Sequence, residues 1–320
     1  MWLVCFEIFM LLIGFILLIT ASDLFVDAIS SLASNFKMSK MAIAMTVGAF
    51  ATCAPELAIS FNSISTGLGD IALSNVVGSS IVNILLIIGV SALCFPIKVK
   101  EHVIKKEALI LLGVTVIFAF SMADNILYNT NDIVLTRMNA VFFIFAFATF
   151  MYFVISQIKM KKGIFHFEKP KYSFWPSILI SAFCICAIIL ASDIVVDFAR
   201  LIAEKFNIST KIITMTVIVI GTSLPELSMT IISAKKKEYD IAIGNIIGTN
   251  IFNIGIVLGL PILIYGNVSS TSFNLIDIFA VLISALLFYI FAKSDRKLTR
   301  REGLTMFLIF IAYYIYLFFQ

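Results

Sequence analysis

Residues 51–56 read ATCAPE, and residues 221–226 read GTSLPE. Each hexapeptide ends in a proline followed by a glutamate, and each lies within a long apolar run. The offset between them holds without a gap over a much longer stretch, since the sequence from Ala21 to Leu93 recurs from Ala191 to Leu263. Roughly a third of the aligned positions are identical, which chance does not explain over such a length. The chain is therefore a duplicated unit with one deep acidic residue in each copy.

The composition places both copies in a membrane. Hydrophobic residues make up 61% of the chain and charged residues 13%, whereas a soluble domain is about 45–50% apolar and about 25% charged. The mean hydropathy is +1.08. A spanning helix needs about 20 apolar residues, and the apolar runs lack the two-residue alternation of a porin. We therefore expect an all-α membrane protein with ten transmembrane helices, near residues 2–22, 40–65, 70–95, 103–123, 133–157, 174–200, 210–234, 240–265, 273–293 and 302–319.

Basic residues are concentrated in alternate loops. The loops after the first, third, fifth, seventh and ninth segments hold most of the 23 Lys and Arg residues. By the positive-inside rule these loops are cytoplasmic and both termini lie outside. The net charge of +4 reflects this topology and does not indicate nucleic-acid binding. Residues 161–173 are predicted to be a short cytoplasmic linker between a first five-helix repeat, 1–160, and a second, 174–320.

Five predicted helices separate each residue from its repeat. Because five is odd, the second copy must enter the membrane from the opposite side. Inverted repeats of this kind place a substrate site near the midplane, at their interface, and provide two related conformations open to opposite sides. The sequence thus predicts a transporter built from two inverted five-helix repeats.

The proline of each hexapeptide predicts a helix break. Proline has no backbone N–H, so the carbonyl four residues earlier loses its hydrogen bond. Those carbonyls belong to Ala51 and Gly221. Non-helical backbone at membrane depth is tolerated where it lines a cavity, and a bound cation would satisfy the free oxygens. Each break thus gathers a carbonyl, a carboxylate and a threonine hydroxyl, from Thr52 in one copy and Thr222 in the other.

A second pair of polar segments follows, at residues 75–83 and 245–253. Within them Ser79 and Asn83, like Thr249 and Asn253, are four residues apart and share a helix face. Carboxylates, carbonyls, hydroxyls and amides together make an all-oxygen site, which suits calcium or sodium and not zinc or copper. Two glutamates neutralise one divalent ion or two monovalent ions, and competition between these loads would couple their movements in opposite directions.

These motifs resemble the alpha repeats of the calcium/cation antiporter superfamily, in its sodium/calcium exchanger branch. The resemblance is carried by GTSLPE at 221–226 and GNIIGTNI at 244–251, with weaker copies in the first half. It covers nearly the whole chain and is of the prokaryotic type, without a regulatory domain. The proton/calcium branch has glycine-asparagine-alanine-x-glutamate instead of threonine-x-x-proline-glutamate, which favours sodium as the driving ion.

The resemblance implies export of Ca²⁺ in exchange for Na⁺ by alternating access, with the first and sixth helices sliding across the rest. It implies no cofactor beyond the transported ions and no nucleic-acid partner, and we expect a monomer in the bilayer of the cell membrane. Calcium is expected on Glu56, Glu226, Thr52 and Thr222. Sodium is expected on flanking sites completed by Ser79, Thr249, Ser223 and nearby carbonyls, with Asn83 and Asn253 at the centre.

The chain departs from the branch at four positions. Asn253 stands where these exchangers commonly have an aspartate, so the central site has one acidic group fewer. Cys53 replaces the usual serine, Ala51 the usual glycine, and Val219 a small residue that usually contributes a carbonyl. Proton/calcium exchange, with Glu56 or Glu226 carrying the proton, is therefore the alternative, and a potassium requirement stays open.

Other interpretations of these residues lie outside antiport. Intramembrane glutamates can be structural hydrogen-bonding groups, but buried charge is costly and marks function by default. A channel could use the same oxygen ligands without needing inverted halves. An enzyme lacks support, because no serine/histidine pair or catalytic aspartate pair occurs at helix depth.

The remaining aspartates receive structural interpretations. One group near helix ends is expected to pair with loop lysines or to reach toward water. Its members are Asp23, Asp27, Asp193 and Asp197. Asp70 and Asp240 are expected to cap the helices that follow them.

Overall fold

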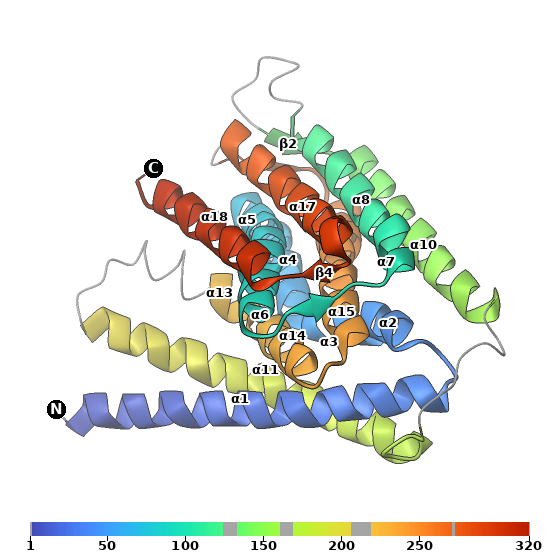
Figure 1. Cartoon of the computed structure of the whole chain (residues 1–320). Coiled ribbons are helices and arrows are strands. Elements are labelled where there is room, and N and C mark those ends of the chain that lie inside the picture. Colours follow the sequence, from blue (N-terminus) through green and yellow to red (C-terminus); the bar gives the residue numbers. More distant parts are fainter. Residues whose placement is uncertain (1, 124–132, 161–168, 206–218, 271–272, 320) are drawn as a thin grey trace.

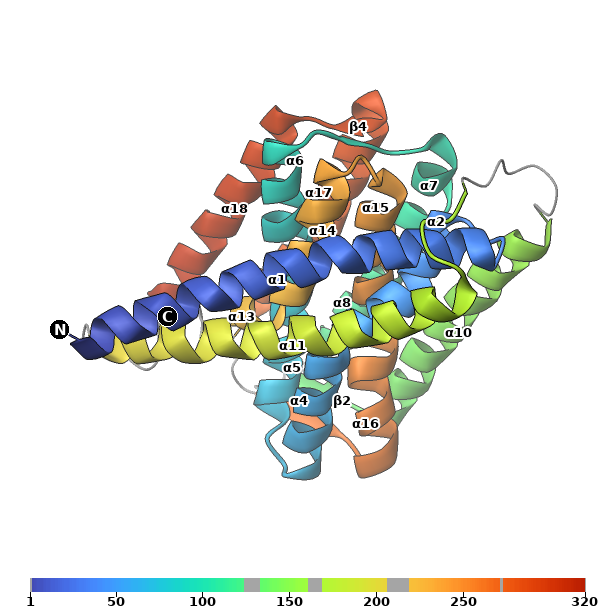
Figure 2. The same cartoon turned by 90° about the horizontal axis from the view of Figure 1, so that it is seen from below.

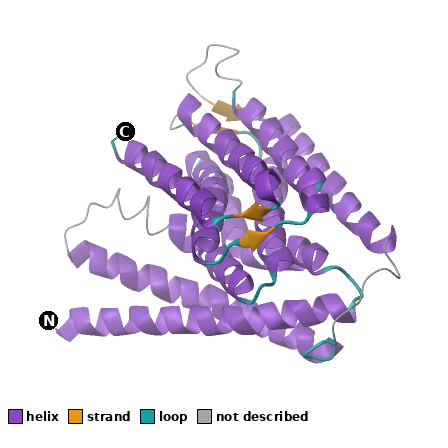
Figure 3. Cartoon of the chain, viewed as in Figure 1, coloured by secondary structure: helices purple, strands orange, loops and turns teal. Residues whose placement is uncertain are grey.

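In the residues that it describes, the computed structural model consists of helices, connecting loops and two short β-ribbons (Figures 1 and 3). It describes residues 2–123, 133–160, 169–205, 219–270 and 273–319. The first copy contains α1 (Trp2–Asn35), α2 (Lys40–Ile43), the π-helix η1 (Ala44–Gly48), α3 (Ala49–Thr52), α4 (Ala54–Ser65), α5 (Gly69–Ile81), the π-helix η2 (Val82–Ile88), α6 (Gly89–Cys94), β1 (Ile97–Lys98), α7 (Glu101–Lys105), α8 (Glu107–Met122), β2 (Ile133–Leu135) and α10 (Arg137–Met160).

The second copy repeats much of this order. Its elements are α11 (Phe174–Lys205), α13 (Val219–Thr222), α14 (Leu224–Lys235), α15 (Tyr239–Phe252), the π-helix η4 (Asn253–Leu258), α16 (Gly259–Tyr265), β3 (Val268–Ser270), α17 (Leu275–Asp295), β4 (Lys297–Leu298) and α18 (Arg300–Phe318). Both ends of α14 are related to the ends of α4 by the offset that relates Ala191 to Ala21, as the duplication predicts. Most of the predicted linker lies outside the described residues.

Six described helices are long and apolar enough to cross a membrane, and the bent pair formed by Lys40–Thr52 and Ala54–Ser65 makes a seventh. This is fewer than the ten predicted segments. Three predicted segments are missing from this set. One is α8, which has only 16 residues, and another is the seventh predicted segment, which starts among residues that the structure does not describe. The third is α18, which has 19 residues and carries charged residues in its first turn. The fold is a multi-pass membrane architecture.

The two longest helices, α1 and α11, run side by side along one face of the molecule (Figures 1 and 2). They pack through small and branched residues: a methyl group added to Gly14 would lie 2.8 Å from Val195 Cγ2. Their outer faces are apolar and exposed, as at Phe9 and Ile16, which suits contact with lipid. Both helices extend past the predicted ends, to Asn35 and Lys205, because the intervening polar residues do not break a helix.

The innermost elements are α5–η2–α6 and α15–η4–α16. Their apolar faces fill the larger buried cluster, in which Ile81 and Ile251 are fully buried. Figure 2 shows α5 and α16 toward one end of the molecule and α6 and α15 toward the other, so the two segments run in opposite directions.

Each β-ribbon ties two distant loops together. In the first, antiparallel pairing brings Lys98 opposite Lys297. In the second, Val134 lies opposite Ser269. Figure 2 shows β4 at one end of the molecule and β2 at the other, so the two ribbons close opposite ends of the helix bundle.

Two of the aspartates predicted near helix ends lie within α1, several residues before its end at Asn35, and they make ion pairs. Lys236 Nζ lies 2.6 Å from Asp27 Oδ1 and 3.1 Å from Asp23 Oδ2, which confirms the predicted pairing for these two aspartates. Lys171 also pairs with Asp27, and that hydrogen bond raises the pKa of the lysine above its ordinary value.

The predicted caps at Asp70 and Asp240 are wrong. Each aspartate lies inside the first turn of its helix, and neither α5 nor α15 has a side-chain cap. Asp70 instead accepts a hydrogen bond from Ser270 of β3, and Asp240 pairs with Lys100. In both cases a donor from a distant part of the chain has replaced the local backbone N–H as the partner of the carboxylate.

Candidate functional site

The two proline motifs interrupt their helices at equivalent residues. Cys53 (φ −80°, ψ 4°) separates α3 from α4, and the chain bends there by 49°. Ser223 (φ −91°, ψ 6°) separates α13 from α14 in the same way. A proline stands in the first turn of the helix after each break, where its missing N–H does least harm. The predicted interruptions are therefore present.

Each break presents a buried glutamate. Glu56 is 1% exposed and Glu226 is 0% exposed, and each lies in the first turn of a 12-residue helix. The positive end of the helix dipole favours an anion at that position. Among the described residues, none of the four carboxylate oxygens has a hydrogen-bond partner, and the two groups are close enough to repel each other. An isolated buried carboxylate is costly, so this pair creates a strong demand for a cation.

The side chains that precede the breaks come from both copies. Thr52 is buried, and its hydroxyl donates to the backbone carbonyl of Ala49 at 3.4 Å. Thr222 is partly buried. Ser223 is 1% exposed, and its hydroxyl has no hydrogen-bond partner in the described part of the chain. The backbone positions predicted to offer carbonyls, Ala51 and Gly221, are also buried.

The amides and hydroxyls of the second pair of segments meet at the interface between the copies. Asn253 Nδ2 donates to Ser79 Oγ at 2.9 Å. Asn83 and Thr249 are buried, and their side-chain polar atoms have no hydrogen-bond partner among the residues described. Asn83 and Asn253 both lie in the first turn of a π-helix, η2 or η4. Such wide turns are frequent at functional sites.

Glycines let α15 reach the first copy. A methyl group on Gly248 would lie 2.6 Å from the carbonyl oxygen of Met45, and one on Gly244 would lie 2.8 Å from Met41 Sδ. Real Cβ atoms essentially never approach so closely. The absence of side chains at these positions therefore allows α15 to pack against α2 and η1 and brings Thr249 and Asn253 to the interface.

One anchoring contact was missed by the sequence interpretation. Asn75 Nδ2 donates to the backbone carbonyl of Glu56 at 3.0 Å and to Ser60 Oγ at 3.1 Å. It thus ties α5 to the turn that carries the glutamate. The recurrence of Asn75 as Asn245 in the second copy was the available signal, but spacing alone does not name a partner on another helix.

The assembled donors are all hard oxygens. In the part of the chain that the structure describes, no three His, Cys, Asp or Glu side chains cluster as a metal-binding group, so the site's negative charge comes from the two glutamates. Carboxylate, hydroxyl and amide oxygens suit calcium and sodium.

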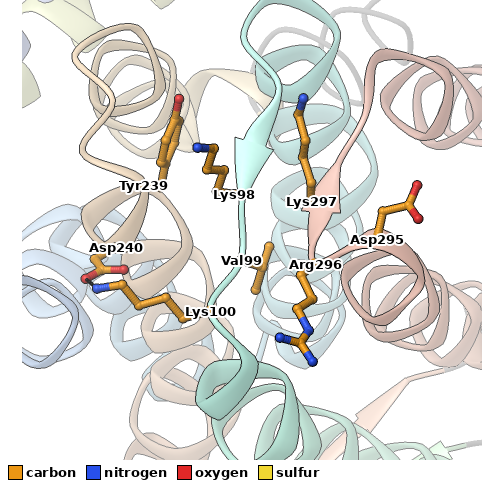
Figure 4. A pocket seen from close by; sticks show the side chains of 8 residues that line it. All are labelled: Lys98, Val99, Lys100, Tyr239, Asp240, Asp295, Arg296 and Lys297. Atoms are coloured by element: carbon orange, nitrogen blue, oxygen red, sulfur yellow. Dashed lines mark hydrogen bonds and ion pairs between the residues drawn. The ribbon is translucent and has the colours of Figure 1, made fainter.

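A surface pocket elsewhere does not compete as a cation site. It has a volume of about 410 Å³ and lies beside the β1–β4 ribbon (Figure 4). Lysines and an arginine dominate its lining, so it repels cations. Nearby, a hydrogen bond from Lys105 and the charge of Arg296 hold the pKa of Glu101 below its ordinary value. The pocket is lined by Lys98, Val99, Lys100, Tyr239, Asp240, Asp295, Arg296 and Lys297.

Sequence comparison matches most of the chain to one family. Residues 6–156 and 176–319 match the family described as "Sodium/calcium exchanger protein". The putative antiporter CaxA of Alkalimonas amylolytica is 33% identical over 317 residues, which cover 96% of this chain and 97% of that protein. The sodium/calcium exchanger MaX1 of Methanosarcina acetivorans is 29% identical over 343 residues, covering 97% of each.

Structural comparison leads to the same kind of protein. The sodium-calcium exchanger NCX_Mj, in crystals soaked with zero Na⁺ and Ca²⁺, superposes with a TM-score of 0.82 and 28% identity. That match covers 98% of this chain and 99% of the other. The same exchanger soaked with 2.5 mM Na⁺ and 1 mM Sr²⁺ gives a TM-score of 0.80.

Proposed function

This chain belongs to the sodium/calcium exchanger protein family, and we propose that it moves Ca²⁺ out of the cytosol in exchange for Na⁺ by alternating access. It is a multi-pass membrane antiporter of calcium and another cation, and not an enzyme. The observation that carries the proposal is the pair of buried carboxylates, Glu56 and Glu226, one at each helix break. Their combined charge of two matches one Ca²⁺ or two Na⁺, so the two loads compete for one place.

The ligands divide by charge. Ca²⁺ binds the two glutamates together with Thr52 and Thr222. Na⁺ ions occupy flanking positions formed by hydroxyls and backbone carbonyls, with the two asparagines at the centre. Burial supports this set, since every member is buried except Thr222, which is partly buried. The flanking and central positions are Ser79, Thr249, Ser223, the carbonyls of Ala51 and Gly221, Asn83 and Asn253.

In this proposal the protein has ten transmembrane helices in two inverted repeats, 1–160 and 174–320. A linker at 161–173 joins the repeats. The repetition of helix bounds at the sequence offset, as in α4 and α14, supports the duplication. The opposite directions of α5–α6 and α15–α16 support the inversion (Figure 2). Inverted halves give two related conformations that open to opposite sides.

The moving part is the pair α1 and α11, which slides across the remaining helices. Its position along one face of the bundle supports this role (Figures 1 and 2). Its contacts with the site-bearing helices include a hydrogen bond between short side chains, in which Ser22 Oγ donates to Ser228 Oγ of α14 at 2.7 Å. A bond of this kind can break and re-form as the pair slides.

Orientation follows from charge. The lysine-rich loops face the cytosol, both termini lie outside, and the protein works as a monomer in the bilayer of the cell membrane. The basic β1–β4 ribbon, with Lys98 and Lys297 opposite each other, supports the cytosolic assignment of that end.

Ion exchange in proteoliposomes tests the proposal. Purified protein is reconstituted, and calcium uptake is measured with sodium, potassium and proton gradients imposed one at a time. We expect an outward sodium gradient to drive calcium uptake into the vesicles. We expect no calcium uptake when the counter-ion is absent. Calcium flux that continues down its own gradient without any counter-ion would identify a channel instead.

Proton/calcium exchange is the second candidate. Asn253 removes an acidic group from the centre of the site, and its Nδ2 donates to Ser79 at 2.9 Å, so the centre is neutral. Because the site has fewer negative charges to bind sodium, a proton on Glu56 or Glu226 can compete with sodium in neutralising the site after calcium leaves. The proton-gradient arm of the same experiment distinguishes the two.

A further inference from the structure

Three polar side chains beyond the exchange site are fully buried and unsatisfied. Thr230 and Ser233 of α14 and Asn245 of α15 are each 0% exposed. Within the described residues, Thr230 Oγ1, Ser233 Oγ and both amide atoms of Asn245 have no hydrogen-bond partner. Buried polar groups are nearly always hydrogen-bonded, because a buried polar group without a hydrogen bond costs about 1–3 kcal/mol of stability. Four such atoms on two adjacent helices indicate a binding site for a polar ligand or an ion.

Helical spacing connects these side chains to the exchange site. Glu226, Thr230 and Ser233 are separated by four and three residues, so they share one face of α14. At about 1.5 Å per residue, Ser233 lies about 10 Å along the axis from Glu226. The helix then ends at Lys235. The hydroxyls therefore lie between the exchange site and the lysine-rich turn at that end of the molecule.

The first copy shows which side chains face each other. There Asn75 Nδ2 donates to Ser60 Oγ at 3.1 Å and to the carbonyl of Glu56. The constant offset between the copies makes Asn245 and Thr230 the equivalents of Asn75 and Ser60. Thus Asn75 and Ser60 are hydrogen-bonded in the first copy, whereas the equivalent Asn245 and Thr230 in the second copy have no hydrogen-bond partner among the described residues.

The π-helix η1 of the first copy packs against this place. A methyl group added to Gly48 of η1 would lie 3.6 Å from Asn245 Oδ1 and 3.1 Å from Met229 Cε. Beyond the end of α14, the ammonium of Lys236 is held by the carboxylates of Asp23 and Asp27 on α1. The charge of this lysine is therefore neutralised and does not oppose a cation at this place.

We propose that Thr230, Ser233 and Asn245 form a transit site for a monovalent cation, Na⁺, between the exchange site and the Lys235–Lys237 turn. The donors are two hydroxyls and one amide oxygen, without a carboxylate of their own. Neutral oxygens hold a monovalent ion briefly, whereas Ca²⁺ is usually bound with carboxylates. The proposal rests on the proposed sodium/calcium exchange and adds a sodium-selective step on one side of it.

Isosteric removal of the hydroxyls tests the site. Thr230→Val and Ser233→Ala are compared with the parent and with Thr115→Val, whose buried hydroxyl already donates to Leu111 O at 2.8 Å. Two activities are measured in proteoliposomes: calcium/calcium exchange, which needs no sodium, and calcium flux against sodium concentration varied separately on each side. Size-exclusion profiles of the purified variants report folding.

We expect both variants to raise the half-saturating sodium concentration by about threefold or more on the side of the Lys235–Lys237 turn. Calcium/calcium exchange should stay within about twofold of the parent, Thr115→Val should match the parent, and Thr230→Ser should restore sodium dependence. Unchanged sodium curves in both variants would overturn the transit site, as would an equal loss of calcium/calcium exchange that Thr230→Ser does not restore. A parent protein that exchanges calcium for protons and not for sodium overturns the proposed function itself, and this site with it.

Discussion

The carboxylates of Glu56 and Glu226 provide the negative charge at the breaks in α3–α4 and α13–α14. Replacing either by glutamine keeps the shape and leaves a single charge to face a divalent ion. We expect Glu56→Gln or Glu226→Gln to lower calcium exchange by more than about tenfold, a loss of at least about 1.4 kcal/mol in ion binding. Because the unpaired charge was costly to bury, the folded protein should be as stable as the parent. Calcium uptake by proteoliposomes and thermal unfolding in detergent measure both effects, and near-normal uptake by either variant would remove that glutamate from the site.

In the proposed site, Asn253 leaves the centre without a charge. Its amide donates to Ser79 and can neither release a proton nor add charge. With two glutamates the site matches one Ca²⁺ or two Na⁺, and a third Na⁺ would leave a net positive charge in surroundings of low dielectric constant.

We expect Asn253→Asp to lower the half-saturating sodium concentration severalfold or to make exchange depend on pH, while calcium binding persists. The added carboxylate supplies a charge for another sodium ion or a group that a proton can occupy. Exchange measured against sodium concentration at several pH values decides this. Superimposable curves for the variant and the parent would show that position 253 does not tune the ion balance.

At the scale of single residues, the candidate site residues that could be predicted from the sequence are those whose chemistry is unusual in a membrane. A glutamate beside a proline in an apolar run is conspicuous, so Glu56 and Glu226 could be chosen at once. Thr230 and Ser233 were not, because hydroxyls are common in helices and usually bond to their own backbone. The folded structure shows that these two have no such partner among the described residues.

Close packing of α15 against η1 positions the second half of the site. A methyl group on Gly248 would meet the carbonyl and Cα of Met45, at 2.6 Å and 2.7 Å. Because backbone cannot move aside as a side chain does, we expect Gly248→Ala to destabilise the protein by about 1–3 kcal/mol and to reduce exchange as Thr249 shifts away.

The matched control is Gly113→Ala in α8, where nothing lies within 4 Å of the added methyl group. Alanine is the better helix former by about 1 kcal/mol, so this variant should be as stable as the parent or slightly more so. Thermal unfolding of the purified proteins in detergent compares them. Equal midpoints for the two variants would mean that α15 tolerates separation from η1.

At the scale of elements, predictions succeeded where a local cause exists. Pro55 and Pro225 lack an N–H, so the breaks beside them could be placed from the sequence. The π-helical turns η1, η2 and η4 have no such local signal in the sequence. The end of α1 was placed too early, at residue 22, because polar residues were taken to mark the membrane boundary while the helix continues to Asn35.

At the scale of the whole molecule, the duplication was readable because the offset that relates Ala21 to Ala191 holds without a gap. It predicted that the helix bounds would recur, as they do in α4 and α14. The β-ribbons could not be predicted in this way. Each pairs loops from different copies, such as Ile97 with Leu298, and two- or three-residue strands carry too little pattern to indicate a partner.

Those ribbons provide the sharpest test of orientation, since they close opposite ends of the bundle (Figure 2). Ser269 of β3 and Lys297 of β4 are both exposed. In a background without the native cysteines, we expect Ser269→Cys to react with a membrane-impermeant maleimide in intact cells. Lys297→Cys should react only after permeabilisation, because the positive-inside rule places the lysine-rich ribbon in the cytosol.

The cysteine-free parent controls for background labelling, which matters because Cys94 and Cys186 are exposed in the native chain. Two different failures are informative. The reverse labelling pattern would invert the orientation, with both termini inside, while leaving the fold intact. Labelling of both positions from the same side would contradict the arrangement of the two ribbons. It would also contradict the opposite directions of α5–α6 and α15–α16, on which the proposed alternating access depends.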